Sequence, residues 1–501
     1  MRWLVLVLVL LALFFQLGAR GLNEPDEGRY AEAAREMAAS GDWLTPRING
    51  FTHLSKPPLT YWSIAASLKL FGVNETTARL PSALAALGAL LALYLMVRGA
   101  ADEHAALWSV VILTTSAMFF LIARLVTADM VLCCWVTWSV WAIWRRSNWL
   151  FVFLALGVLT KGPVAVVLPL FAFIGLRPPL REFRWVIGLP VFLALSASWF
   201  VALALQNPEL WRYFFVREIF QRVATGEHGR SQPWWFLIVV TLGGFLPWSF
   251  TLFTRRPLDA TTRMFAAWAV LGVLLFSLSQ SKLPTYALPL MPPLAALAAM
   301  TPPRRWHNAL VSVSLVAALL LLTHYLRTRC GLATSWVIAI NVVAVIGALA
   351  ALFYRHAAVV TFLAVVLAVI ALLPGIERQL RHNTSMKPLA ERVRREDPLG
   401  KALVVGHRCL PTTFLFYLQR PVRAYNPGAT NRVAVFEFHH PAPGSPLLVT
   451  DLAAYRAMLA TTQRVFCVAS ADATETMREE TGVAWRELER AGYTVLLSNQ
   501  P

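Results

Sequence analysis

Charged side chains are scarce in this sequence. Asp, Glu, Lys and Arg make up 14% of the 501 residues, whereas about a quarter of a typical soluble domain is charged. Hydrophobic residues make up 57%, and the mean hydropathy is +0.57. These values exclude a soluble globular protein and indicate an integral membrane protein.

Lysine is rarer still, because only six of the 45 basic residues are lysine and the net charge of +18 comes from arginine. Most arginines stand in short loops between apolar runs, which is a membrane-topology pattern and not a phosphate-binding stripe. We therefore expect no nucleic-acid partner.

Cysteine is also rare, and its spacing excludes several kinds of site. The chain has five cysteines, with no CxxC pair and no zinc-type spacing of Cys and His. Cys133 and Cys134 lie in an apolar run and are predicted to pack there. Cys409 and Cys467 can pair if the C-terminal region lies in an oxidising compartment. No nucleotide-binding fingerprint, internal repeat or low-complexity tract is present.

Apolar runs near the ~20 residues that cross a bilayer predict about thirteen spans. The first run has the length of a signal peptide, but it lacks a clear small-residue cleavage site and is interpreted as a retained span. The runs lie at about 3–19, 76–97, 104–122, 130–144, 149–160, 163–176, 185–206, 234–253, 263–279, 285–300, 308–324, 333–353 and 357–374.

The arginines predict the orientation of these spans. With the N-terminus in the cytoplasm, the loops on that side hold most of the arginines, as the positive-inside rule requires. The 20–75 loop then lies outside, with Asp129, Lys161, the 207–233 loop and Lys282. Every residue considered for chemistry below therefore faces one compartment.

The composition changes near the C-terminus. Short apolar runs typical of buried strands lie at 402–405, 465–468 and 493–497. Residues 471–491 are predicted to be helical, with a break at Gly482. An odd number of spans places this region outside. We therefore predict a transmembrane domain at 1–376 and a soluble periplasmic α/β domain at 377–501.

The first outer loop carries a cluster of ionisable residues. Asp26 and Glu27 are adjacent, and Arg29 follows Asp26 by three residues, on the same side of a helical turn. A helix is predicted at 27–39, ended by Gly41. Asp26 alone can be a helix N-cap, but a cap does not explain the acidic pair and the arginine. Because ionisable groups are expensive at a membrane, the cluster predicts a functional site.

Lys56 is predicted to lie at the start of a second interfacial helix. Pro57 and Pro58 follow it, and proline favours an extended residue before it and the first turn of a helix. A cation beside free backbone N–H groups suits a phosphate. The alternative is an interfacial lysine whose ammonium reaches water.

Further ionisable residues are predicted at the outer ends of spans. Asp129 can instead be a charge that favours a helix N-terminus. Lys161 and Lys282 stand beside apolar runs, where a charge must face protein or water. Tyr286 adds a hydroxyl close to Lys282, and His228, in an outer loop, can equally be solvated. Carboxylates with several cations suit displacement of a lipid phosphate by a polar acceptor.

These motifs, in this order, resemble the polyprenyl-phosphate-sugar glycosyltransferases, a family that includes the bacterial aminoarabinose transferases of lipid A and, more distantly, the protein O-mannosyltransferases. The resemblance covers residues 1 to about 300. It is carried by Asp26-Glu27-Gly28-Arg29-Tyr30-Ala31-Glu32, Lys56-Pro57-Pro58-Leu59, Asp129-Met130, Thr160-Lys161-Gly162-Pro163, Pro233-Trp234-Trp235 and Ser281-Lys282-Leu283-Pro284-Thr285-Tyr286.

The resemblance implies an all-α polytopic membrane protein of the GT-C type, with outer interfacial helices and the small C-terminal α/β domain. It implies Asp26 as the catalytic carboxylate, with Glu27 beside it and Asp129 as a second acid. The residues that it implies for lipid-phosphate and donor binding are Arg29, Tyr30, Lys56, Lys161, Lys282 and Tyr286.

Two departures from the family pattern concern metal binding. Ser55 stands where the family commonly has an acid before the Lys-Pro-Pro motif, and that acid has been linked to a metal in relatives. His228 is separated from the Pro-Trp-Trp motif by four residues. We therefore expect no cofactor, with a divalent metal as the alternative.

We predict a multi-pass protein of a bacterial inner membrane whose active site faces the periplasm. It would move a sugar from an undecaprenyl-phosphate-type carrier to lipid A, by displacement with inversion. A glycan or protein acceptor, as in the O-mannosyltransferases, is the alternative within this chemistry. A transporter or flippase of lipid-linked sugars is the alternative of another class, disfavoured because the chain lacks internal symmetry and its charges cluster on one side.

Overall fold

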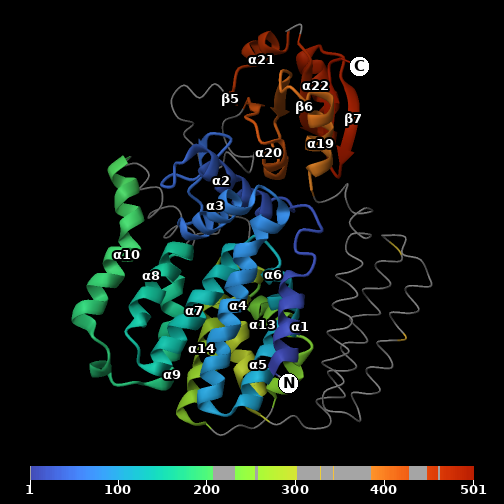
Figure 1. The fold of residues 1–501 in the computed structure, drawn as a ribbon. Helices are drawn as coiled ribbons and strands as arrows, with labels where there is room; N and C mark the ends of the chain where they lie inside the picture. Colours follow the sequence, from blue (N-terminus) through green and yellow to red (C-terminus); the bar gives the residue numbers. More distant parts are fainter. Residues whose placement is uncertain are drawn as a thin grey trace. The chain divides into compact units, whose positions relative to one another are not determined.

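The computed structural model describes residues 2–206, 232–253, 258–301, 385–427, 448–460 and 463–500, together with residues 328 and 342. Helices form most of this part, with a few strands (Figure 1). The chain divides into two compact units. We name them the helical unit (1–17, 56–60 and 79–373) and the mixed unit (18–55, 61–78 and 374–501).

Helices with roughly aligned axes form most of the described part of the helical unit (Figure 1). They are α1 (Arg2–Phe14), α4 (Glu75–Ala100, from Arg79 onwards), α5 (Glu103–Thr115), α6 (Ala117–Ala123), α7 (Ala128–Arg145), α8 (Trp149–Lys161), α9 (Val164–Leu176), η1 (Leu180–Glu182), α10 (Trp185–Gln206), α13 (Phe236–Gly244), η3 (Trp248–Leu252), α14 (Ala260–Leu278), η4 (Pro284–Leu290) and α15 (Met291–Ala299). α7 packs on α8 and α9, and α9 packs on α14. Val186, Leu205 and Leu278 are largely exposed, as expected of side chains that face lipid.

Three of the described helices, α4, α10 and α14, are long and apolar enough to cross a membrane. The pair α5 and α6, bent by 69°, makes a fourth if it is one span. Other predicted spans match shorter apolar helices, such as α8 and α9 with 13 residues each. The predicted spans at 308–324, 333–353 and 357–374 lie outside the described residues, so the number thirteen stays a prediction.

Two arginines hold the C-terminal end of α1. Arg124 donates to four backbone carbonyls between Ala12 and Gln16, at 2.8–3.3 Å. The fully buried Arg79 donates to the carbonyl of Leu17 at 3.0 Å. The last carbonyls of a helix lack partners within it and carry partial negative charge, so a guanidinium is well placed there. These two arginines therefore have a structural explanation.

The mixed unit begins with two helices and a hairpin: α2 (Asp26–Ser40), β1 (Arg47–Ile48), β2 (Phe51–Thr52) and α3 (Leu59–Phe71, from Tyr61 onwards). Gly41 ends α2 with φ +76°, as the sequence predicted. α3 starts directly after Pro58, also as predicted. The hairpin turns at Asn49 and Gly50, both with positive φ.

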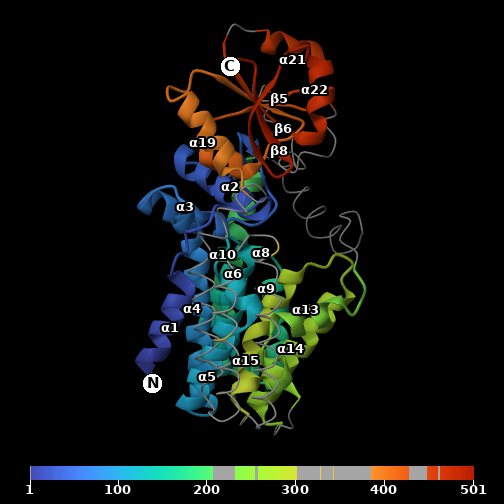
Figure 2. The same cartoon turned by 90° about the vertical axis from the view of Figure 1, so that its right-hand side faces the viewer.

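The C-terminal part of the mixed unit is a six-stranded sheet in the order β5-β4-β3-β6-β8-β7. β5, β4, β3 and β6 are parallel, and β8 and β7 continue the sheet antiparallel. Figure 2 shows α21 and α22 on one side of the sheet and α19 on the other. The elements are α19 (Lys387–Glu396), β3 (Leu403–His407), α20 (Thr412–Leu418), β4 (Arg423–Tyr425), β5 (Leu448–Val449), α21 (Leu452–Leu459), β6 (Val465–Ser470), η5 (Ala471–Ala473), α22 (Thr474–Thr481), β7 (Arg486–Ala491) and β8 (Thr494–Ser498).

The three predicted strands are confirmed as β3, β6 and β8, and α22 ends at Gly482 with φ +66° as predicted. The prediction of a helix after Gly482 is wrong, because β7 occupies Arg486–Ala491. The sequence there favours a helix, but pairing with β8 along the sheet edge overrides that local preference.

Cys409 and Cys467 are free thiols, so the pairing that the sequence allowed is not formed. Cys467 is fully buried in the sheet, where its thiol lies 3.6 Å from the sulfur of Met477. Burial raises the pKa of Cys467 to about 12. This cysteine is therefore a packing residue with little thiolate character.

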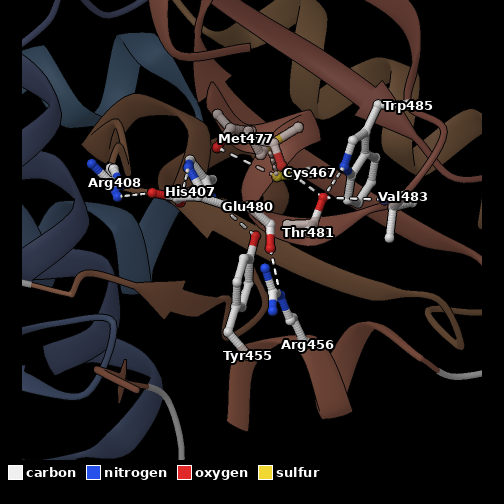
Figure 3. Close-up of polar contacts among 11 residues, drawn as sticks. His407, Arg408, Tyr455, Arg456, Cys467, Met477, Glu480, Thr481, Val483 and Trp485 are labelled. Carbon is white, nitrogen blue, oxygen red and sulfur yellow. Dashed lines mark hydrogen bonds and ion pairs between the residues drawn. The ribbon is translucent and has the colours of Figure 1, made fainter. Parts of the chain in front are cut away.

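A polar cluster lies where β3 ends, between the sheet and the helices α21 and α22 (Figure 3). His407 is fully buried, and its Nδ1 lies 3.2 Å from the hydroxyl of Tyr455. Its Nε2 lies 3.6 Å from a carboxylate oxygen of Glu480, which also pairs with Arg408. Arg456 donates to the backbone carbonyl of Glu480 at 2.6 Å.

Candidate active site

The mixed unit holds the first group of predicted site residues, on the opening turn of α2. Asp26 is the first helical residue and Pro25 precedes it as the N-cap, so Asp26 does not cap the helix. The Asp26 carboxylate is paired with Arg29, one turn later, as the spacing predicted. The Asp26 side chain is 72% exposed, whereas that of Arg29 is 20% exposed. The Asp26 carboxylate is thus exposed, and it pairs with a guanidinium that is more buried.

Arg29 is a fully charged partner for this carboxylate. Burial lowers the pKa of its guanidinium, but the Asp26 carboxylate and the hydroxyls of Tyr30 and Tyr61 raise it by more, so the pKa lies above its usual value. The rings of Tyr30 and Tyr61 lie 5.6 Å apart. Tyr30 therefore lies close to Arg29, and its role in donor binding stays a prediction.

Glu27, predicted as the partner acid of Asp26, points the other way. Its side chain is almost fully buried and accepts a hydrogen bond from the backbone N–H of Asn23 at 3.0 Å. Arg20 lies 3.4 Å from the same carboxylate. Glu27 therefore stabilises the segment that leads into α2, and the two adjacent acids lie in different environments.

The sequence analysis missed a second buried acid on α2. Glu32 is buried and accepts two hydrogen bonds from Arg35, both at 2.7 Å. Burial raises the pKa of Glu32 to about 8, against the opposing effect of Arg35. Glu36 holds the hairpin turn through the N–H of Gly50 at 3.1 Å and that of Asn49. Helical periodicity alone does not reveal this second packing surface of α2.

Ser55, which stands where the resemblance implies an acid, belongs to a hydrogen-bonded chain. Its hydroxyl lies 3.0 Å from Nε2 of His53 and 3.2 Å from the hydroxyl of Tyr61. Divalent cations prefer carboxylate and imidazole ligands on a common centre, and this position offers a hydroxyl. Among the residues that the structure describes, no group of three or more His, Cys, Asp or Glu is placed to hold a metal ion. The residues present do not fit a metal here.

The helical unit holds the second group, centred on Asp129 and Lys161. Asp129 lies in the first turn of α7, where Thr127 is the N-cap and accepts from the N–H of Asp129 at 3.1 Å. Lys161 is the last residue of α8, which Gly162 ends with φ +80°. The Lys161 ammonium pairs with the Asp129 carboxylate and lies 4.9 Å from the centre of the Tyr286 ring. The packing of α7 on α8 and on η4 thus brings three predicted residues together.

Lys282 does not join this cluster. Its side chain is buried, and its ammonium donates to the backbone carbonyl of Gln232 at 2.9 Å. Lys56 also belongs to the helical unit, three residues before the start of α3, and is partly exposed. His228 lies outside the described residues.

The fold matches that of a solved structure along its whole length. ArnT from Cupriavidus metallidurans, bound to undecaprenyl phosphate, superposes with a TM-score of 0.85 at 24% identity, over 100% of this chain and 98% of that one. Its apo form gives a TM-score of 0.84. Residues 55–203 also match the family model of the dolichyl-phosphate-mannose-protein mannosyltransferases.

This chain has the ArnT-like GT-C membrane fold. It is also similar in sequence to two curated relatives, both named undecaprenyl phosphate-alpha-4-amino-4-deoxy-L-arabinose arabinosyl transferase. That of Erwinia tasmaniensis is 30% identical, over 60% of this chain and 59% of its own length. Transferase 2 of Proteus mirabilis is 33% identical, over 58% of each chain. This GT-C protein thus spans just under three fifths of the length of the relatives that it matches.

The two groups of residues differ in exposure. On the opening turn of α2, the Asp26 carboxylate that pairs with Arg29 is 72% exposed. In the Asp129–Lys161 pair, which lies beside the ring of Tyr286, the two side chains are only 12% and 14% exposed.

Proposed function

We propose that this chain transfers a sugar from undecaprenyl phosphate to an acceptor at the outer face of a bacterial inner membrane. The observation that carries the proposal is the Asp26–Arg29 pair, an exposed carboxylate fixed by a charged guanidinium at the start of α2. The names of the curated relatives favour 4-amino-4-deoxy-L-arabinose as the sugar. Lipid A is the acceptor that the sequence resemblance implies.

The reaction is a single displacement with inversion. An oxygen of the acceptor forms a bond to the anomeric carbon, and the bond from that carbon to the phosphate oxygen breaks. The electron pair of the broken bond stays on the phosphate, which leaves as undecaprenyl phosphate with one more negative charge. Arg29 is held in place by Asp26 before the reaction, and a preorganised charge of this kind stabilises a developing anion. Lys56 has the same task in our proposal.

The task of Asp26 depends on the acceptor. If the acceptor is a hydroxyl, Asp26 takes its proton as the new bond forms. If the acceptor is a phosphate of lipid A, it is already ionised and no base is needed. Asp26 then binds the ammonium group of the aminosugar and balances the charge around the anomeric carbon.

The remaining predicted residues support these two events. Glu27 is buried beneath the turn and positions it. Lys161 pairs with Asp129 and lies beside the ring of Tyr286, and we assign these three residues to binding of the donor sugar. We assign Tyr30 and Lys282 to donor binding as well.

We further propose the predicted topology for the intact protein. An odd number of spans, about thirteen, would place the two termini on opposite sides of the membrane. The N-terminus would then lie in the cytoplasm, and the sheet of the mixed unit would lie in the periplasm. The C-terminal boundary near residue 377 stays part of this proposal.

A second candidate within this chemistry is transfer of a hexose to protein, and the match of residues 55–203 to the protein mannosyltransferase family favours it. One experiment separates the two. Lipid A from cells with and without this gene is analysed by mass spectrometry, with the undecaprenyl-linked sugar pathway active. Loss of an aminopentose mass on deletion, restored by the wild-type gene and not by Asp26→Asn, supports the main proposal. Unchanged lipid A, with loss of a hexose from secreted proteins, supports the second candidate.

A further inference from the structure

The turn that carries Asp26 and Arg29 lies against the start of α20, almost 400 residues later in the sequence. Glu24 accepts a hydrogen bond from the hydroxyl of Thr412 at 3.0 Å and another from the backbone N–H of Thr413. The first N–H groups of a helix have no partner within it, and a carboxylate is the strongest common acceptor for them. Glu24, which stands two residues before Asp26 in the chain, therefore contacts the N-terminus of α20.

Gly28 brings the two backbones into direct contact. It stands between Asp26 and Arg29, and a Cβ atom added there would lie 2.8 Å from both the backbone nitrogen and the Cγ2 of Thr413. A backbone atom cannot give way as a flexible side chain can. Only glycine therefore lets the α2 turn approach α20 this closely, which gives a physical reason for glycine at this position.

α20 is a rigid support for the turn. All seven of its residues are buried, it packs on α19, and it follows β3 directly in the chain. Tyr417, near its end, accepts a hydrogen bond from the N–H of Leu22 at 2.8 Å and donates to Glu75 at 3.1 Å. Lys387 of α19 donates to the same Glu75 oxygen at 2.6 Å.

The far end of α2 is also tied to the C-terminal part of the mixed unit. Asn49, in the hairpin turn that Glu36 of α2 holds, donates to the carbonyl of Val422 at 2.7 Å. In return, Asn49 accepts from the N–H of Val422 at 2.9 Å. Both ends of α2 are therefore anchored to the C-terminal part of the mixed unit, one at the first turn of α20 and the other at Val422, which follows α20.

We propose that Glu24 and Gly28 make the C-terminal sheet domain a positioning element of the active site, by fixing the Asp26–Arg29 turn on the N-terminus of α20. Neither residue touches the reacting atoms in this proposal. They act through the turn, so their loss affects the transfer step more than the binding of donor. This inference rests on the proposed function of Asp26 and Arg29.

The kinetic test uses the full-length protein with undecaprenyl-phosphate-linked aminoarabinose as donor and lipid A as acceptor. Glu24→Ala removes both bonds to α20, and a small misplacement of catalytic groups costs about 100-fold. We therefore expect kcat to fall about 10- to 100-fold, with KM for the donor within about twofold of wild type. Glu24→Gln keeps one acceptor oxygen and is expected to restore most of kcat.

Asp451→Ala is the matched control, because Asp451 also caps a helix of the mixed unit, accepting from the N–H of Ala454 at 2.7 Å. It loosens α21 without touching the α2 turn and is expected to leave kcat unchanged. An equal loss of kcat in Glu24→Ala and Asp451→Ala, or a change confined to KM, would overturn the proposal.

Amide hydrogen exchange tests the mechanical link independently of the reaction. Glu24→Ala and Gly28→Ala are each expected to raise exchange in residues 22–30 and at the start of α20, and Asp451→Ala is expected to raise it in α21 only. If wild type transfers no sugar but the exchange pattern holds, the proposed function fails and the positioning contact stands. If exchange in residues 22–30 is unchanged in both Glu24→Ala and Gly28→Ala, the positioning role is contradicted, whatever the transfer activity of these variants.

Discussion

Lys161, at the end of α8, pairs with Asp129, in the first turn of α7, and stands over the ring of Tyr286. The two charged side chains are only 14% and 12% exposed. A partly buried ion pair contributes little net stability, but removal of one partner leaves the other charge without compensation. Removal of one charge and removal of both charges should therefore differ in their effect on stability. This difference allows the structural role of the pair to be measured separately from its functional role.

Asp129→Asn is therefore expected to destabilise the protein by about 3 kcal/mol, because it leaves the Lys161 ammonium without its carboxylate. Asp129→Asn combined with Lys161→Met removes both charges and is expected to recover most of the thermal midpoint, yet not the transfer activity. Thermal unfolding of the purified protein in detergent and a turnover assay measure the two effects. A single variant as stable as wild type contradicts this account.

Asp26→Asn is expected to abolish transfer, by at least about 100-fold, without loss of folded protein. The Asp26 side chain is mostly exposed and makes its ion pair on the helix surface, so its charge is dispensable for folding. Turnover with purified protein and the yield of folded protein check this. Asp42→Asn is the control, since Asp42 lies in the same loop and pairs with Arg47. Normal turnover by Asp26→Asn removes the catalytic assignment.

Lys56→Ala is expected to raise KM for the donor about tenfold, the loss of roughly one charge-assisted hydrogen bond to the lipid phosphate. KM for the acceptor should change much less. Lys69→Ala is the matched control, because Lys69 lies at the other end of α3, 5.9 Å from the ring of Trp43. Both constants are read from initial rates with each substrate varied in turn. Equal weakening of donor and acceptor argues against a phosphate role.

Local signals made parts of this structure predictable from sequence. Gly41 and Gly482 end helices at the predicted positions, and the Pro57-Pro58 pair begins one. The strands β3, β6 and β8 are continuous apolar runs, which sequence patterns identify well. The pairing of Asp26 with Arg29 followed from a spacing of three residues.

Local sequence signals could not predict the contacts between segments that are distant in the chain. The bonds of Glu24 to Thr413 and of Asn49 to Val422 join segments more than 370 residues apart. Nothing in the local sequence indicated that Glu27 and Glu32 are buried, because glutamate is mostly exposed in proteins and is rarely fully buried unless it is paired. Asp129 and Lys161 were each identified, but only the packing of α7 on α8 makes them a pair.

His407, buried where β3 ends, is expected to make the mixed unit sensitive to acid. Burial, together with the neighbouring Arg408 charge, lowers the pKa of His407 to about 4. Nδ1 of the neutral ring lies 3.2 Å from the hydroxyl of Tyr455, and Nε2 lies 3.6 Å from the carboxylate of Glu480 (Figure 3). The facing charged groups are Arg408 and Glu480, which pair with each other.

The sign of the effect follows from proton binding in the two states. Below the ordinary pKa of about 6.5 the unfolded chain protonates this histidine, whereas the folded protein resists until about pH 4. The stabilisation is therefore complete above about pH 6.5 and declines as the pH falls toward 4, by roughly 3 kcal/mol. Hydrogen exchange at β3 and β6 of the full-length protein, corrected for the intrinsic pH dependence of exchange, measures this decline.

His407→Gln is expected to flatten the decline between pH 6.5 and 4, at some cost in stability at neutral pH. His104→Gln is the control, because His104 is an exposed residue of α5 in the helical unit, where its Nε2 accepts from the indole N–H of Trp108 at 2.9 Å. It is expected to keep the wild-type slope at β3 and β6. If His407→Gln shows the same slope as wild type, the acid sensitivity arises from other groups, and the buried neutral histidine is not its cause.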